Sequence, residues 1–431
     1  MLIYDDLLQK EKKLAVIGLG YVGLPLALAF AEKVSVIGYD VDEKRIGLLK
    51  EGIDSSKAIP SGAFTGKDIV FTSEADLLRE AAVFIVAVPT PVDRHKVPDL
   101  QPLLHASEAV GRVLKKGDYV VFESTVYPGC TEEECLPVLE KWSGLRCPVD
   151  FKLAYSPERI NPGDEAHTLQ NTVKIVAACD AVALEQTAKL YELVVTAGVH
   201  NAPGIKVAET GKMLENTQRY VNISLMNELS VICDKLGINT LDVLEAAGTK
   251  WNFMKFTPGL VGGHCIGVDP YYLKHKARQL GYHAQVLASG EWVNDEMPYH
   301  VSKKVLQHIV RTGVHPNQAR VLVLGITFKE NVSDIRNSKV IHLVKDLMDY
   351  SVQVDVMDCC ADALEVYEQH RIPLKEKAGT GYDAVILAVG HNAYRHFSEE
   401  EILAFCKPRA IFADLKGYYR NKFSTLAHWN L

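Results

Sequence analysis

The chain has 431 residues, of which 48% are hydrophobic and 23% are charged, and its formal net charge is -7. This length exceeds what one hydrophobic core usually serves, so we expect two or three domains. The ordinary composition and the negative charge argue against general nucleic-acid binding, and no stretch approaches the roughly 20 apolar residues that span a membrane.

The cysteines and the N-terminal segment indicate the compartment. Nine cysteines occur, an odd number without a CxxC pair, which fits neither a disulfide framework nor a zinc site. Residues 1–13 are mixed in charge and lack the apolar core of a signal peptide. We therefore expect reduced thiols, no metal and a cytoplasmic location.

The first half of the chain alternates short apolar runs with helix-like segments. This alternation predicts a parallel sheet flanked by helices, because strands buried on both faces are apolar throughout. The expected strands are residues 14–18, 34–39, 83–88, 119–122 and 174–177, and a further strand ends at Tyr155.

A glycine-rich turn follows the first expected strand. It runs Gly18-Leu19-Gly20-Tyr21-Val22-Gly23 and opens an apolar helix, and the second strand ends in Asp40. Glycines at this spacing allow a tight turn and a close approach of a pyrophosphate, while the acid can bind both adenine-ribose hydroxyls. The motif predicts NAD, although Lys44 and Arg45 leave NADP open. The alternative is a turn that only packs helix on strand.

Polar loops end three later strands, where ligands of such sheets bind. Thr90 lies between two prolines, and Thr125 follows Glu123 and Ser124. Both hydroxyls could face a dinucleotide or a water beside it. A third loop, residues 155–163, places Glu158, Arg159 and Asn161 close together. Each loop by itself could equally be an ordinary solvated turn.

A long helix is predicted over residues 205–237. Leu214, Val221, Leu225, Leu229 and Ile232 recur at helical spacing, which is typical of an amphipathic helix.

The same helix carries a polar stripe. Lys212 and Asn216 are four residues apart and share a face, with Glu209 and Arg219 close to it. An ammonium and an amide directed at one point suit an oxyanion. The alternative is an exposed polar pair.

One thiol lies in a glycine-rich turn, Gly262-Gly263-His264-Cys265-Ile266-Gly267-Val268-Asp269-Pro270. The glycines would let backbone and ligand approach closely, and flanking amides can stabilise a thiolate. This predicts a nucleophile with a carboxylate four residues on. The alternative is a small, inert residue that closes a turn.

A second αβ alternation follows the polar segment 312–318, with strands expected at 321–325, 352–356, 384–388 and 410–413. Its first strand leads into the loop 325–338, where Lys329 and Arg336 could bind phosphate and Ser338 is a plausible helix N-cap. A surface charge cluster is the competing interpretation. The expected fold is α/β, with two Rossmann-like parallel-sheet domains, 1–203 and 312–431, joined by a helical domain, 204–311, that contains the long helix.

Jointly, these motifs resemble the UDP-glucose/GDP-mannose dehydrogenase family over nearly the whole chain. The resemblance rests on the glycine turn, Val88-Pro89-Thr90-Pro91, Glu123-Ser124-Thr125, Ser156-Pro157-Glu158, the Lys212/Asn216 helix, Gly-Gly-x-Cys with Asp269, and Phe328-Lys329 with Asp334 and Arg336. It implies oxidation of a nucleotide sugar at C6 to the uronic acid with two NAD. Within the family, the chain is most similar to the UDP-N-acetylhexosamine 6-dehydrogenases of bacterial surface polysaccharide (capsule, O-antigen) synthesis. This similarity rests on the segments Tyr155 to Gly163, Glu215 to Arg219 and Pro258 to Tyr272. It also rests on Gly267, because the glucose-specific branch usually has proline at that position.

The resemblance also implies residue roles. Cys265 would form a thiohemiacetal and then a thioester, with proton transfers at Asp269, Thr125, Lys212 or Glu158 and with Lys212 and Asn216 holding the oxyanion. Further residues would bind the ligands. For NAD they are Gly18, Gly20, Tyr21, Val22, Gly23, Asp40, Arg45, Thr90, Thr125 and Arg336, and for the UDP-sugar they are Glu158, Arg159, Asn161, Lys212, Asn216, Arg219, Phe256, Gly262 and Lys329.

A homodimer is implied as well, and the aromatic-rich segment 251–256 could be covered by the second subunit.

Other functions stay open at this point. A two-electron dehydrogenase of the 6-phosphogluconate or hydroxyacid type would share the NAD domain and the lysine/asparagine pair but would need no thiol. A dinucleotide-binding regulator would leave Cys265 silent. Within the family, UDP-glucose and UDP-N-acetylmannosamine remain alternative substrates, and the preferred C4 epimer is not decided by these motifs.

Overall fold

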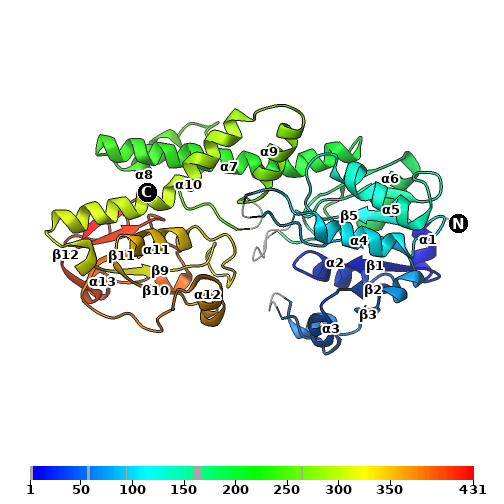
Figure 1. Cartoon of the computed structure of the whole chain (residues 1–431), viewed down its shortest axis with the longest axis horizontal. Helices are drawn as coiled ribbons and strands as arrows, with labels where there is room; N and C mark the ends of the chain where they lie inside the picture. The colour runs from blue at the N-terminus through cyan, green and yellow to red at the C-terminus, as the bar shows by residue number, and fades with distance from the viewer. Residues whose placement is uncertain (1–2, 56–58, 94, 160–166, 264–265) are drawn as a thin grey trace. The chain divides into compact units, whose positions relative to one another are not determined.

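The computed structural model describes residues 3–55, 59–93, 95–159, 167–263 and 266–431. The chain divides into two compact units. The first contains residues 1–215 and 271–282, and the second contains residues 216–270 and 283–431. Each unit has its own sheet covered by helices (Figure 1). The three-domain boundaries expected from the sequence stay a prediction.

The first unit is built on an eight-stranded sheet of order β3-β2-β1-β4-β5-β6-β7-β8. Its pairings are parallel except for the antiparallel pair β6–β7. The strands are β1 Lys13–Ile17, β2 Val36–Tyr39, β3 Ile69–Thr72, β4 Ala81–Val86, β5 Tyr119–Phe122, β6 Lys152–Tyr155, β7 Lys174–Ala178 and β8 Val199–Asn201. The expected α/β class with a parallel-dominated sheet is confirmed, and β6–β7 is an antiparallel exception within it.

The first unit also contains helices. They are α1 Ile3–Leu8, α2 Gly23–Phe30, α3 Glu43–Lys50, α4 Gln101–Gly111, α5 Leu136–Ser143, α6 Ala181–Glu192 and α9 Asp269–Gln279, with short turns of helix at Ser61–Phe64, Ala75–Glu80 and Thr131–Cys135. Strands β4 and β5 are buried at every residue, which explains their uninterrupted apolar sequences.

The long helix α7 spans Ile205–Leu236, as the sequence predicted. Its apolar stripe is not the buried face, however. Leu225 and Ile232 are 56% and 48% exposed, whereas Tyr220 and Asn227 on another face are buried. Periodicity therefore located the helix correctly, and its apolar stripe lies uncovered in the single chain.

The second unit has a five-stranded sheet of order β10-β9-β11-β12-β13, in which every pairing is parallel. The strands are β9 Arg320–Leu324, β10 Gln353–Met357, β11 Tyr382–Leu387, β12 Cys406–Asp414 and β13 Ala427–Asn430. The helices are α8 Thr240–Ala247, α10 Gln285–Arg311, α11 Val340–Asp349, α12 Ala363–His370 and α13 Glu399–Phe405, with short turns at Pro316–Gln318 and Asn392–Tyr394.

The described helices include none that combines the length and the hydropathy needed to cross a membrane.

Candidate active site

The three glycines of the first turn have three different surroundings. Gly18 has φ +89°, and a Cβ there would lie 2.9 Å from the carbonyl oxygen of Ala87. A Cβ on Gly23 would lie 1.8 Å from the carbonyl oxygen of Gly18, so this glycine allows α2 to approach β1. A Cβ on Gly20 would meet no described atom within 4 Å. Gly20 therefore borders open space, as a position that admits a pyrophosphate requires.

Asp40 and Arg45 both hold this turn. The Asp40 carboxylate accepts hydrogen bonds from the amides of Leu19, at 2.8 Å, and Asp42, at 3.0 Å. The Arg45 guanidinium donates to the carbonyl of Leu19 at 2.7 Å and pairs with the buried Asp54 at 3.2 Å. The acid lies at the end of β2, where a ribose-binding carboxylate belongs. The Arg45 side chain thus links the glycine turn to Asp54.

Hydrogen bonds join the loops after β4 and β5. The Thr90 hydroxyl donates to the carbonyl of Thr125 at 2.6 Å, and the Ser124 hydroxyl donates to the carbonyl of Val88 at 2.7 Å. The Tyr272 hydroxyl of α9 donates to the carbonyl of Thr90 at 2.8 Å. The structure thus brings Thr90 and Thr125 together, as expected for two residues of one site.

A buried ionic cluster lies at the ends of β5, β6 and β7. The Lys174 ammonium is 2.8 Å from the Glu123 carboxylate and 3.5 Å from that of Glu158. The Tyr191 hydroxyl of α6 donates to Glu123. Burial, partly offset by Lys174, raises the pKa of Glu123 to about 7. Burial lowers the pKa of Lys174, but Glu123 and then Glu158 outweigh that effect, and the net pKa is raised.

The rest of this loop is partly described. Arg159 pairs with Glu215 of α7 at 2.7 Å and donates to the carbonyl of Val173 at 2.7 Å. The amide of Arg159 donates to Glu158 at 2.6 Å. Asn161, which the sequence placed in the substrate site, lies outside the described residues.

The polar stripe of α7 divides into residues with different environments. Lys212 is buried, and the Asn216 amide donates to the buried Asp269 carboxylate at 2.5 Å. Glu209 accepts from the amides of Gly129, at 2.5 Å, and Thr131, at 2.9 Å, so it holds a neighbouring loop of the protein. Arg219 is exposed. The structure therefore joins Asn216 to Asp269, and the protein itself satisfies Glu209.

The turn that precedes Cys265 packs against the loop after β9. A Cβ on Gly262 would lie 2.5 Å from the carbonyl oxygen of Asn337, and Gly263 has φ +84° with Phe328 2.6 Å from the position of a Cβ. These glycines admit a close approach of the protein's own backbone and of the Phe328 ring at this place. The approach of a ligand to the same turn stays a prediction. Cys265 itself lies outside the described residues, and Phe256, also expected at the substrate, is half-buried.

The second unit repeats the backbone geometry of the first turn. Gly325 follows β9 with φ +89°, and its amide donates to the carbonyl of Met357 at the end of β10 at 2.8 Å. The amide of Ile326 donates to the carboxylate of Asp358 at 2.6 Å, as that of Leu19 does to Asp40. Asp358 is thus the counterpart of Asp40.

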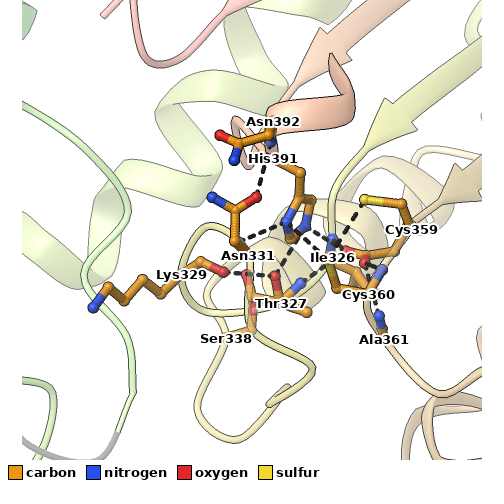
Figure 2. A network of polar contacts seen from close by, with 11 residues as sticks. Ile326, Thr327, Lys329, Asn331, Ser338, Cys359, Cys360, Ala361, His391 and Asn392 are labelled. Atoms are coloured by element: carbon orange, nitrogen blue, oxygen red, sulfur yellow. Dashed lines mark hydrogen bonds and ion pairs between the residues drawn. The ribbon is translucent and has the colours of Figure 1, made fainter. Parts of the chain in front are cut away.

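His391 distinguishes this second turn (Figure 2). Its Nδ1 accepts from the amide of Asn331 at 2.9 Å, which places the ring proton on Nε2, 3.1 Å from Asp358. Burial alone would raise the pKa of Asp358, but the bonds from His391 and Ile326 outweigh it and lower the pKa to about 2. The Asp358–His391 pair therefore clamps the loop that carries Lys329.

Asp358, Cys359, Cys360 and His391 form the group of described residues closest to metal-ligand spacing, with ligand atoms within 4.8 Å of one another. Both imidazole nitrogens already have protein partners, and we interpret the group as a hydrogen-bonded clamp.

A pocket adjoins the clamp, with Thr327, Phe328, Lys329, Lys339 and Lys416 among its lining residues. Three cations at one pocket suit an anionic ligand. Lys416 pairs with Glu330 at 3.0 Å and Lys339 with Asp295 at 2.7 Å.

One expectation for this loop is wrong, and the ligand role of Arg336 stays a prediction. Ser338 is not the N-cap of α11, since Lys339 occupies that position and the Ser338 hydroxyl bonds the carbonyl of Thr327 at 3.3 Å. Arg336 forms a two-pronged pair with Asp334, with its closest contact at 2.6 Å.

Sequence reasoning missed Lys174, Tyr191, Asp358 and His391 as site residues. Lys174 was assigned only to a strand, and Tyr191 lies on a helix far along the chain. Asp358 had a usable signal, because it ends the second strand of the second alternation as Asp40 does in the first. No sequence pattern indicated His391, because only the fold brings its side chain to Asp358.

The strand order β3-β2-β1-β4-β5-β6, the glycine turn and the acid after β2 are typical of the NAD-binding domain of a dehydrogenase. Models of the UDP-glucose/GDP-mannose dehydrogenase family match three segments: the NAD binding domain at residues 12–195, the central domain at 206–296 and the UDP binding domain at 322–421. The chain belongs to this family. It is an NAD-dependent nucleotide-sugar dehydrogenase with a UDP-sugar substrate.

Three relatives illustrate the similarity. The chain is 48% identical to a UDP-N-acetyl-D-glucosamine 6-dehydrogenase of Pseudomonas aeruginosa, over 94% of this chain and 97% of that protein. It is 30% identical to a UDP-N-acetyl-D-mannosamine dehydrogenase of Methanococcus maripaludis, over 92% of this chain and 90% of that protein. A solved UDP-D-ManNAc dehydrogenase from Pyrococcus horikoshii superposes with a TM-score of 0.88 at 28% identity, covering 97% and 98%.

Proposed function

We propose that this enzyme oxidises the C6 hydroxyl of a UDP-N-acetylhexosamine, UDP-GlcNAc or UDP-GalNAc, to the uronic acid, as a precursor of bacterial surface polysaccharide. The identity of 48% to a UDP-N-acetyl-D-glucosamine 6-dehydrogenase, against 30% to a mannosamine enzyme, supports this sugar class. UDP-glucose and UDP-N-acetylmannosamine are the alternatives. The contact between Asn216 and Asp269 carries the proposal, because it joins the helix motif to the cysteine motif.

The first step needs a proton acceptor and stabilisation of the developing oxyanion. When bound, NAD supplies a hydride acceptor for each of the two oxidations. Asp269 is buried and held by Asn216, so it is fixed in direction, and Lys212 is buried one helical turn earlier on α7. We assign the alcohol proton to Asp269, through a water shared with Thr125, or to Lys212. Lys212 and Asn216 stabilise the oxyanion.

The second step uses Cys265. Its sulfur adds to the aldehyde carbon, and the carbonyl oxygen takes up a proton to give a thiohemiacetal. Loss of a second hydride from that carbon, together with loss of the proton of its hydroxyl group, leaves a thioester. A water then attacks the thioester carbon, its proton passes to Glu158 or Asp269, and the C–S bond breaks to release the thiolate and the carboxylic acid. One uronate is formed for two NAD reduced.

We further propose that the enzyme is a homodimer. Leu225 and Ile232 are exposed along α7, and Trp251 and Met254 are 92% and 58% exposed. A second copy that packs on these side chains would bury them, which stabilises an interface at about 25 cal/mol per Å² of apolar surface.

The test measures NADH released per substrate across a panel of UDP-hexoses and UDP-N-acetylhexosamines. Two NADH per UDP-N-acetylhexosamine support the proposal, whereas one would indicate the hydroxyacid type of enzyme. NAD binding without uronate from any UDP-sugar would indicate a regulator.

Cys265→Ser tests the covalent step. We expect it to stall after the first oxidation or at the ester, while Cys406→Ser, which changes a cysteine of β12, keeps the parental rate. Uronate formation by Cys265→Ser at the parental rate would refute the thiol mechanism.

A further inference from the structure

Two neighbouring cysteines follow Asp358 at the end of β10. The sulfur atoms of Cys359 and Cys360 lie 3.5 Å apart, so the two side chains meet (Figure 2). Cys359 is exposed and Cys360 is partly buried. The reaction described above uses neither thiol. A solvent-accessible thiol next to a second thiol is a common arrangement in redox-sensitive sites.

The Asp358 carboxylate holds both the cysteine segment and the glycine turn. Its Oδ1 accepts from the amides of Cys360, at 2.7 Å, and Ala361, at 2.8 Å. Its Oδ2 accepts from the amide of Ile326 at 2.6 Å and lies 3.1 Å from Nε2 of His391. A change in the backbone at Cys360 is therefore passed through one carboxylate to the turn after β9.

The Cys360 side chain also contacts His391. Its sulfur lies 3.4 Å from Nδ1, the nitrogen that accepts from the amide of Asn331 at 2.9 Å. Because Nδ1 is an acceptor, the thiol is the donor in this contact. Asn331 belongs to the loop that carries Lys329, and its side chain accepts from the amide of Asn392 at 2.9 Å. Cys360 is therefore a direct neighbour of the Asp358–His391 clamp.

We propose that Cys359 and Cys360 form a site of reversible two-electron oxidation by a peroxide, and that the disulfide between them weakens binding of the nucleoside diphosphate in the adjoining pocket. That pocket is lined by Thr327, Phe328 and Lys329, which follow the turn held by Asp358. The proposal rests on the UDP-sugar substrate of the proposed function and on its UDP moiety binding at this pocket.

The oxidation balances with hydrogen peroxide as the oxidant. The exposed Cys359 sulfur attacks one peroxide oxygen, the O–O bond breaks, and the thiol proton leaves with the other oxygen as water. The Cys360 sulfur then attacks the sulfur of the Cys359 sulfenic acid. The S–O bond breaks, and the hydroxyl group leaves as water with the Cys360 proton. Burial, together with the contact to Cys359, raises the pKa of Cys360 to about 12, which favours Cys359 as the first thiol to react.

A disulfide between neighbouring residues would disturb the clamp. Neighbouring Cα atoms are about 3.8 Å apart, whereas disulfides usually join Cα atoms about 4.4–6.8 Å apart, so the bond distorts the peptide between the two cysteines. The sulfur atoms must also approach from 3.5 Å to about 2.05 Å, so at least one side chain leaves its present contacts. Strained disulfides are easily reduced, which makes the change reversible.

The experiment measures the Kd of UDP by isothermal titration with full-length Cys265→Ser protein, in which the thiol assigned to catalysis cannot react. We expect hydrogen peroxide to remove two hydrogens from the peptide that contains both Cys359 and Cys360. We expect UDP binding to weaken about tenfold, as loss of one hydrogen bond in the clamp would cause, and a thiol reductant to restore it.

Added cysteine substitutions identify the thiols that respond. Adding Cys359→Ser, which changes the exposed thiol, should abolish both the mass change and the loss of affinity. Adding Cys406→Ser, which changes a cysteine of β12, serves as the control and should abolish neither. If the Cys359→Ser protein does not fold, Cys360→Ser carries the same expectation.

A pair of thiols that stays reduced under peroxide, or a disulfide that leaves the Kd unchanged, would overturn the inference. So would a loss of affinity that persists in folded Cys359→Ser protein. The untreated protein separates the two proposals. Failure to bind UDP before peroxide is added would refute the proposed function and this inference with it, whereas UDP binding that peroxide leaves unchanged would refute only the role of the two thiols.

Discussion

Replacing Asp40 by Asn tests how the first turn recognises its cofactor. The Asp40 carboxylate accepts from the amides of Leu19 and Asp42, at 2.8 and 3.0 Å. Asn keeps one acceptor oxygen but presents an NH₂ group in place of the other, and this group cannot accept from an amide or a ribose hydroxyl. The variant also loses the negative charge that disfavours a 2′-phosphate.

The magnitude follows from the kind of bond that is lost. A hydrogen bond to a charged acceptor contributes about 1.5–3 kcal/mol. Loss of one such bond to the adenine ribose, at about 2 kcal/mol, weakens NAD binding by roughly 30-fold. Because NADP loses a repulsion at the same time, the ratio of the NADP Kd to the NAD Kd falls.

Isothermal titration of NAD and NADP measures both effects, with thermal unfolding as a check on the turn. Glu43→Gln removes an exposed acid from the first turn of α3 and should leave both Kd values at the parental level. A folded Asp40→Asn variant that binds NAD within about twofold of the parent, with an unchanged NADP to NAD ratio, would refute the assigned role of Asp40.

Further predictions concern stability. Gly23→Ala places a Cβ 1.8 Å from the carbonyl oxygen of Gly18, so denaturant unfolding should show a loss of about 1–3 kcal/mol or more. Gly20→Ala should keep the parental stability and weaken only NAD binding; equal losses in both variants would contradict the division of roles. The lowered pKa of Asp358, about 2, stabilises the fold above about pH 4, and this stabilisation is lost as the pH falls toward 2. Asp358→Asn should therefore cost about 2 kcal/mol at pH 7 and flatten acid unfolding below pH 4; an unchanged acid transition would count against it.

Local sequence patterns predicted most of the fold. Five of the strands in the first unit were expected from apolar runs, and α7 was placed to within one residue. The missed strands β3, β8 and β13 are short and partly exposed, so they lack a continuous apolar run. The apolar stripe of α7 did not show what covers it, because periodicity marks a surface that avoids water and does not say which molecule packs on it.

The candidate site was predictable only where a motif is contiguous. Asp40 and the glycine turn are close in sequence, and their spacing follows from the strand–turn–helix–strand unit that binds a dinucleotide. Lys174 lies 51 residues from Glu123 along the chain, and their contact depends on the pairing of strands β5, β6 and β7. His391 reaches Asp358 in the same way, across 33 residues. Contacts of this kind come from topology, which residue types alone do not disclose.

The His391 imidazole makes the glycine turn after β9 different from the glycine turn after β1, because it contacts Asp358, the counterpart of Asp40. In the C-terminal turn, a side chain of the protein already fills the place next to the acid, so the loop with Lys329 is shaped before any nucleotide arrives. In the turn after β1, each oxygen of the Asp40 carboxylate accepts one backbone amide and has a second lone pair that can accept from a ribose hydroxyl. The same backbone turn is therefore completed by an imidazole of the protein after β10, whereas after β2 the acid accepts only backbone amides among the described hydrogen bonds.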